Sequence, residues 1–221
     1  MHTFHTVNIV IHVVSGTLCL LIGSIAIFLR NNRPAHRNIG WLYTWLMVVV
    51  ITTALLGVFV FKVNSLLLVV TLLAAYNTFS GLRAIRLKGA RPKVLDFIVA
   101  SLVLSSAVFY VYYIKSIAVF WSPSVVFATV GSVAMNTSYD FGKYFMSARW
   151  LQRTFLYEHV YKMVSSLSAS FAAFSGTVFY MYHPYSQLLP SILGFTVIMI
   201  IFKQIAQQRG KRTAKQLQKV G

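Results

Sequence analysis

The residues of this chain that could do chemistry are its histidines and its few acids, and most of them lie in or beside long apolar stretches. His12, His36 and His159 are the first candidates, because imidazole can ligate a metal ion or haem iron and can also pass on a proton. His12 and His183 are predicted towards the outer side of a membrane, and His36 and His159 towards the inner side. Paired histidines on facing helices would suit haem or a divalent metal as the cofactor.

All three acids of the protein are predicted at one level, the cytoplasmic mouth of a helical bundle, together with His36 and His159. One interpretation is ion pairing that limits repulsion among the surrounding Lys and Arg side chains. Glu158 and Lys162, with the acid four residues before the base, fit such a pair on one helix face. The other interpretation is a site that holds a metal, binds an anion or relays protons. The polar residues of this predicted inner cluster are Asp96, Tyr139, Asp140, Glu158 and Lys162.

Long hydrophobic runs provide the elements that must position these groups. The 221 residues are 57% hydrophobic and 10% charged, so a soluble domain would expose too much apolar surface. About 20 helical residues cross a bilayer core, and the runs do not alternate as barrel strands do. We therefore predict an all-α, polytopic integral membrane protein whose single domain, 1–207, is a seven-transmembrane-helix bundle. The predicted spans are 7–29, 39–61, 65–85, 95–114, 118–136, 156–182 and 187–207.

The basic residues between these runs alternate in number, and the alternation predicts the orientation. The successive connections carry 3, 1, 5, 1, 3 and 0 Lys or Arg residues, and the C-terminal part carries 6. By the positive-inside rule the N-terminus is outside and the C-terminus is cytoplasmic, in a bacterial cytoplasmic (inner) membrane. The net charge of +17 is then explained by the membrane, and no nucleic acid is expected as a partner. The expected partners are the bilayer and its anionic headgroups, which the basic tail 208–221 would also contact.

Small residues predict where helices approach closely. His12, Gly16, Cys19 and Gly23 share one face of the first predicted helix, which turns His12 towards the bundle. The sixth predicted helix has small residues on two sides, so we expect it to be central and packed by several neighbours.

Several short blocks, spread over nearly the whole chain, resemble an uncharacterised family of small bacterial multi-pass "predicted membrane proteins" with a domain of unknown function, common in Bacteroidetes-type genomes. The family usually has Arg-His where this chain has Glu158-His159, and Arg where it has Lys162. The resemblance implies the fold and topology above and carries no activity. It marks His12, His36, Asp96, Asp140 and His159 as the family's polar positions. The matching blocks are His12-x-x-Ser15-Gly16, His36-Arg37-x-x-Gly40-x-x-Tyr43, Thr78-Phe79-Ser80-Gly81-Leu82-Arg83-Ala84, Asp96, Asp140, and Glu158-His159 leading to Lys162-Met163.

Four functions are compatible with these residues. The first is a redox or binding protein that holds haem or a metal through His12, His36 and His159. The second is a proton-coupled or small-solute transporter with His12, Asp96, Asp140 and His159 as relay groups. The third is an intramembrane metal-dependent hydrolase at the inner mouth, built on His36, His159 and a carboxylate. The fourth is a structural or accessory membrane protein without a site.

Overall fold

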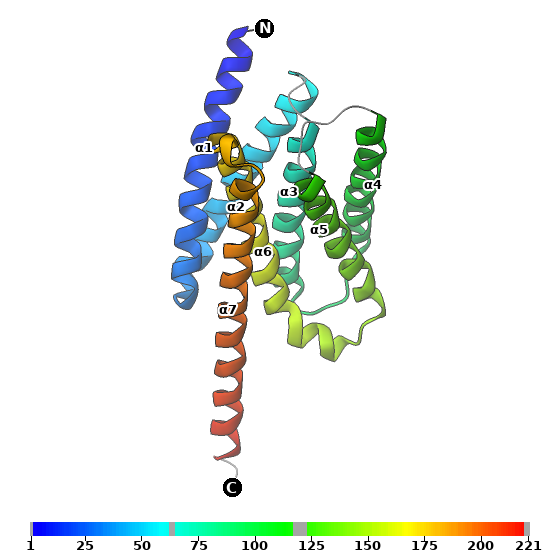
Figure 1. Ribbon diagram of the computed structural model, residues 1–221. Coiled ribbons are helices and arrows are strands. Elements are labelled where there is room, and N and C mark those ends of the chain that lie inside the picture. Colours follow the sequence, from blue (N-terminus) through cyan, green and yellow to red (C-terminus); the bar gives the residue numbers. More distant parts are fainter. Residues whose placement is uncertain (1, 62–64, 117–122, 219–221) are drawn as a thin grey trace.

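A computed structural model describes residues 2–61, 65–116 and 123–218. Within these ranges the chain is helical throughout, with seven α-helices, three short 3-10 helices (η1–η3) and no strand (Figure 1). The all-α prediction is therefore confirmed for the described part of the chain. The α-helices are α1 His2–Phe28, α2 Arg33–Phe59, α3 Ser65–Leu87, α4 Val94–Ser116, α5 Pro123–Gly142, α6 Ala148–Val178 and α7 Tyr185–Leu217. The 3-10 helices are η1 Leu29–Asn31, η2 Lys143–Phe145 and η3 Tyr180–Tyr182.

Three helices extend further than the membrane spans predicted for them. We expected His36 in a loop, but α2 already begins at Arg33, since the Asn32 side chain caps it and Pro34 fits the first turn. α6 begins at Ala148 rather than 156, with Ser147 as its cap, so Glu158 lies inside the helix. α7 continues to Leu217, well into the predicted tail 208–221. The predicted start of the fifth span, residue 118, and the last three tail residues lie outside the described residues.

Five helices among the described residues, α1, α2, α3, α4 and α7, are long and apolar enough to cross a membrane. The prediction of a helical protein with helices that are long and apolar enough to span a membrane is thus confirmed. The count of seven spans stays a prediction, because α5 and α6 do not reach the same hydropathy. Both of these helices carry polar and charged side chains in their interior-facing turns.

α6 lies at the centre of the bundle, as its small residues predicted. It packs against α1, α3 and α7, and Figure 1 shows α3 and α7 on either side of it. α5 packs mainly against α4 and α3, so it shares α3 with α6 as a neighbour. The core between these helices includes Met47, Val133 and Leu167. α3 thus contacts both the central helix α6 and α5.

Gly23 of α1 marks a close approach between α1, α2 and α6. A β-carbon at Gly23 would lie 2.7 Å from Leu167 Cδ1 and 2.8 Å from the Tyr43 ring. At Gly16, on the same helix, a β-carbon would meet no atom within 4 Å. The two glycines therefore form a matched pair, one at a packed site and one at an open site.

We predict that Gly23→Ala lowers the free energy of unfolding by about 1–3 kcal/mol, because the added methyl overpacks the contact with Tyr43 and Leu167. Gly16→Ala is the control, and it should be neutral or stabilising by up to about 1 kcal/mol through helix propensity. Denaturant unfolding in detergent measures both values. Equal effects of the two substitutions would contradict the packing described for α1.

Candidate functional site

Four charged residues of α5, η2 and α6 form a buried ion cluster, which we define as Asp140, Lys143, Glu158 and Lys162. Lys162 Nζ lies 2.6 Å from Asp140 Oδ1 and 2.8 Å from Glu158 Oε1. Lys143 Nζ lies 2.7 Å from Asp140 Oδ1 and 2.6 Å from Glu158 Oε1. Each lysine therefore bridges the same two carboxylates, and the cluster has no net charge.

The cluster is deeply buried, so each of its charges must be paired with an opposite charge, because an unpaired buried charge is strongly unfavourable. Lys162 is only 1% exposed, and the other three residues are 6–8% exposed. Tyr76 of α3 donates a hydrogen bond to Asp140 Oδ2, and the Tyr139 ring lies beside both ammonium groups. Burial alone would lower the pKa of Lys143, but the Asp140 and Glu158 carboxylates outweigh it and hold that pKa above its ordinary value.

A small hydroxyl network extends from the cluster along α6. Ser166, one turn after Lys162, donates a hydrogen bond to the Ala74 carbonyl at 3.0 Å and lies 2.7 Å from Thr78 Oγ1. Tyr43 of α2 donates to the same serine oxygen at 3.3 Å. These bonds join α2, α3 and α6 in a region that the core otherwise fills with apolar side chains.

The third acid lies in a separate ion pair. Asp96, in the first turn of α4, accepts two hydrogen bonds from the Arg83 guanidinium, at 2.6 and 2.8 Å, and one from the Lys93 backbone. The predicted i, i+4 pair of Glu158 and Lys162 is present, and among the described residues all three acids are ion-paired. The ion-pairing interpretation of the inner cluster is therefore confirmed. The pairing is internal rather than at a solvated rim.

The histidines are divided between two places. His36 and His159 are neighbours, with ring centroids 6.4 Å apart and planes at 88°. Each Nδ1 lies 2.9 Å from a backbone carbonyl, of Ala26 and Gly81 respectively. His12 is elsewhere, 2.9 Å from Thr53 Oγ1 between α1 and α2. His183 follows η3, in the connection before α7.

The described residues contain no group of three His, Cys, Asp or Glu side chains placed to hold a metal ion. His36 and His159 are close enough to act together, but the nearest carboxylates are already paired with lysines. A metal site or a hydrolase would need a third ligand that the described residues do not place beside these histidines, and the haem hypothesis, which needs only two axial histidines, stays a prediction.

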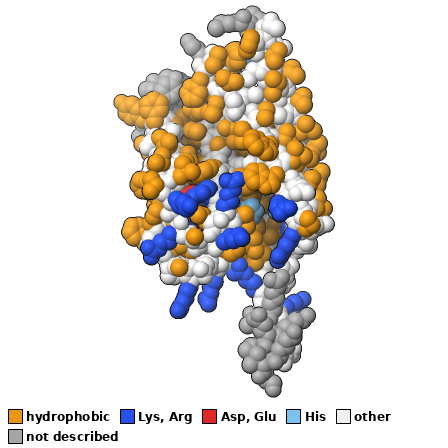
Figure 2. Space-filling model, turned by 180° about the vertical axis from the view of Figure 1, so that it is seen from behind, with side chains coloured by type: hydrophobic (Ala, Val, Ile, Leu, Met, Phe, Trp, Pro, Cys, Tyr) orange, Lys and Arg blue, Asp and Glu red, His pale blue; other side chains and the backbone are white. Residues whose placement is uncertain are grey.

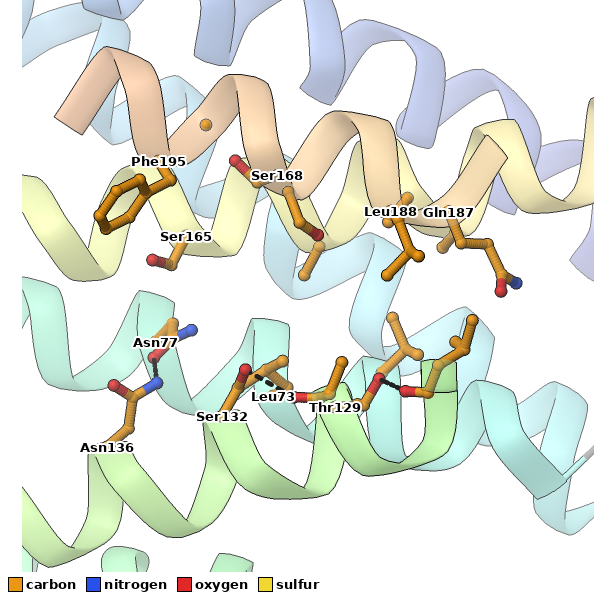
Figure 3. A pocket seen from close by; sticks show the side chains of 18 of the residues that line it. Leu73, Asn77, Thr129, Ser132, Asn136, Ser165, Ser168, Gln187, Leu188 and Phe195 are labelled. Atoms are coloured by element: carbon orange, nitrogen blue, oxygen red, sulfur yellow. Dashed lines mark hydrogen bonds between the residues drawn. The ribbon is translucent and has the colours of Figure 1, made fainter. Parts of the chain in front are cut away.

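A second feature is a groove of about 250 Å³ between two halves of the bundle, shown in Figure 3. We call it the polar-ended groove. α5 forms one wall, α6 and α7 form the other, and α3 contributes its base. Most of its lining is apolar or small, and none of its lining side chains is charged. The polar lining residues are Asn77, Thr129, Ser132, Asn136, Ser165, Ser168, Thr177, Gln187 and Ser191.

The two ends of the groove keep hydrogen-bonding atoms without a partner. Asn77, 1% exposed, accepts a bond from Asn136 at 3.0 Å, but its own Nδ2 has none. Gln187, 9% exposed, has no partner for Oε1. In Figure 3 the two asparagines lie at one end and Gln187 at the other. A buried amide without its hydrogen bond is costly, so both ends indicate a missing partner.

Three hydroxyl groups along the middle of the groove are already engaged by their own helices. Thr129, Ser132 and Ser168 each donate to the carbonyl one turn earlier on their own helix. Such side chains present mainly methylene and methyl surface to a ligand. The groove thus has an apolar body, one free donor at the Asn77 end and one free acceptor at the Gln187 end.

The buried ion cluster lies next to the Asn77 end of the groove. Asn136 precedes Asp140 by one turn of α5, and Asn77 follows Tyr76, which contacts Asp140. On α6, Lys162 comes shortly before the lining residue Ser165. The cluster therefore connects α5 to α6 at one end of the groove.

Lys and Arg side chains gather at one end of the molecule. Figure 2 shows them at the end from which the C-terminal helix projects, whereas hydrophobic side chains cover the remainder of that face. The orientation that the basic residue counts predict stays a prediction.

Sequence reasoning missed the groove and one of the four residues of the ion cluster, Lys143, together with its neighbour Tyr76. Asn77, Asn136 and Gln187 carried a usable signal, because amide side chains are uncommon in membrane helices and point to partners. Lys143 was counted only as a loop charge, and Tyr76 resembles any interfacial aromatic residue. Their roles follow from the approach of α3, α5 and α6, which no local pattern encodes.

Comparisons of the chain with protein-family models, with curated proteins and with solved structures found no match. The resemblance to small bacterial multi-pass membrane proteins therefore stays a prediction.

We predict that Lys162→Met destabilises the protein by about 3–5 kcal/mol, because it leaves two buried carboxylates with a single lysine. Lys203→Met, at an exposed position of α7, should change stability by less than about 0.5 kcal/mol. Adding Glu158→Gln to Lys162→Met restores charge balance and should recover part of the loss. Denaturant unfolding in detergent measures all three, and a harmless Lys162→Met would show that the cluster does not hold the helices together.

Lys143 should make stability sensitive to strongly alkaline pH. Its pKa is raised in the folded state, so its contribution is complete below the ordinary lysine pKa of about 10.4 and is lost as pH rises through the raised value. We expect Lys143→Met to have a flatter alkaline stability profile than the wild type. Unfolding free energies measured from neutral pH to about pH 11 test this, and parallel profiles would contradict it.

Proposed function

We propose that this chain is a multi-pass carrier of the bacterial cytoplasmic membrane, which binds an uncharged small molecule inside its helical bundle and moves it across the bilayer. The observation that carries the proposal is the polar-ended groove with its free Asn77 and Gln187 amide atoms. Polar groups inside a membrane bundle are expensive to maintain, and in transporters they surround the substrate path. A purely structural bundle would have filled this volume with apolar side chains.

The electrostatics of the groove support an uncharged substrate. No lining side chain is charged, and the adjacent ion cluster has equal numbers of positive and negative groups. A charged ligand would have to enter a low-dielectric groove without a counter-ion, which is strongly unfavourable.

The proposal includes seven spans with the N-terminus outside and the C-terminus in the cytoplasm. The gathering of Lys and Arg at one end of the molecule supports this orientation (Figure 2). α5 and α6 have lower hydropathy because polar side chains of both helices face the groove and the ion cluster. Such inward-facing polarity is the pattern expected of spans that line a site.

In this proposal the ion cluster acts as a fixed connection between α5 and α6. It connects α5 to α6 at the Asn77 end, whereas α5 otherwise packs against α3 and α4. A fixed joint at one end lets the helices separate towards the other end without loss of the fold. Movement of α5 about this joint would change access to the groove.

We predict that an uncharged ligand stabilises the wild-type protein but not Ala128→Phe, which places a phenyl ring in the groove. At a concentration one hundred times its dissociation constant, the ligand should stabilise the wild type by about 2.7 kcal/mol. Thermal unfolding in detergent with glycerol, urea, long-chain alcohols and monoacylglycerols measures the effect, and proteoliposomes then test transport of any compound that binds.

Gly131→Phe is the matched control, because Gly131 lies on the same helix, does not line the groove and has open space around it. It should respond to the ligand as the wild type does. If no compound distinguishes Ala128→Phe from Gly131→Phe, the groove is not a ligand site and the proposed function fails.

A further inference from the structure

We infer that the substrate of the polar-ended groove is a short polyol of the size of glycerol, which passes in a row with water between the Gln187 end and the Asn77 end. This inference rests on the proposed function and adds the substrate class and the direction of the path.

The groove runs lengthwise between the helices. Its lining residues on α6 extend from Tyr161 to Thr177, about 24 Å along a helix, and those on α7 extend from Gln187 to Ile198, about 16 Å. The hydrocarbon core of a bilayer is about 30 Å thick, so the groove covers more than half of that thickness in the proposed spans. A solute that travels from one end of the groove to the other therefore moves along the helices and across the membrane.

The two ends of the groove require opposite hydrogen-bonding partners. Asn77 Nδ2 needs an acceptor, and Gln187 Oε1 needs a donor. A hydroxyl group, like water, is a donor and an acceptor at once, so one kind of group satisfies both ends. A ketone or an ether only accepts, and it would leave the Gln187 oxygen without a partner. The ends therefore select a substrate that carries hydroxyl groups over its whole length.

The middle of the groove offers acceptors beside apolar surface. Thr129 and Ser168 donate their hydroxyl hydrogens to their own helices, but each oxygen keeps a lone pair that can accept from a ligand. Figure 3 shows these two side chains on opposite sides of the groove, and apolar residues such as Leu73 and Ala169 complete the lining. A polyol fits this mixture because its carbons carry both C–H groups and hydroxyls. Urea has no C–H surface and would place N–H groups against apolar side chains.

The volume of the groove limits the length of the polyol. A cavity of roughly 10–15 Å³ holds one water, so the groove of about 250 Å³ holds several waters, or a short polyol together with waters. Clefts that hold compact drug-sized molecules are larger, at about 300–1,000 Å³. Because this volume is spread along the helices, the groove is narrow and favours an unbranched compound with few carbons over a sugar ring.

Glycerol uptake by proteoliposomes that contain the full-length protein, followed as osmotic re-swelling, tests the inference. Ala128→Phe should reduce the protein-dependent glycerol flux about tenfold or more, whereas Gly131→Phe should leave it unchanged. Gln187→Met, which keeps the side-chain length but removes the acceptor, should reduce the flux about three- to tenfold. The same change at the exposed Gln208 is its matched control and should have no effect. The Gln187 variant keeps the test valid if Ala128→Phe fails to fold.

Other solutes separate this inference from the proposed function. Urea should cross more slowly than glycerol, and faster crossing of urea would overturn the inference. Water flux without glycerol flux, or a glycerol flux that is equal in all variants, would overturn it too. If a long-chain alcohol or urea crosses in a manner that Ala128→Phe abolishes, while glycerol does not cross, the polyol inference fails and the proposed function survives. If no solute distinguishes Ala128→Phe from Gly131→Phe, both fail.

Discussion

The rest of the fold depends on the pairing of four buried charged side chains. Lys143 and Lys162 each bridge Asp140 and Glu158 in a region where water and lipid headgroups are largely excluded. Removing one partner from such a cluster leaves a charge that the surrounding protein cannot solvate, so the four groups must stay together. Because they come from α5, η2 and α6, they connect two helices that share α3 as a neighbour but make few direct contacts with each other. The cluster thus adds a direct connection between α5 and α6 to the contacts that both helices make with α3.

The groove follows from that arrangement. α6 packs with α1, α3 and α7, whereas α5 packs with α3 and α4, and the space between α5 and α7 is left to small and polar side chains. Free amide atoms at its two ends are difficult to explain as packing, because native interiors rarely leave such groups without partners. They are readily explained as atoms that a ligand bound in the groove would contact. The ion cluster therefore connects α5 to α6 at one end, and the groove occupies the space between α5 and α7 beyond that connection.

Much of this fold could be predicted from the sequence, since hydrophobic runs, basic connections and small-residue stripes are local properties. The existence of seven helices, the central position of α6 and the pairing of Glu158 with Lys162 were all predictable in this way. The depth of that pair was not, because the start of α6 at Ala148 depends on a cap at Ser147 outside the apolar run. Histidines drew attention as the usual carriers of chemistry, yet His12 lies apart from His36 and His159. The groove could not be predicted, because it depends on which helices do not pack against each other. That Asn77 and Gln187 each have an amide atom without a hydrogen-bond partner is visible only in the structure.

The most direct test of a ligand site in the polar-ended groove, next to the buried ion cluster, is an experimental structure of the full-length protein in lipid nanodiscs. We expect α5 and α7 to stand apart, with one elongated density between them that reaches the amides of Asn77 and Gln187. Lys162 should lie between Asp140 and Glu158 in the same map. A structure in which α5 packs directly on α7, with both amides bonded to neighbouring side chains and no density between the helices, would contradict the ligand site.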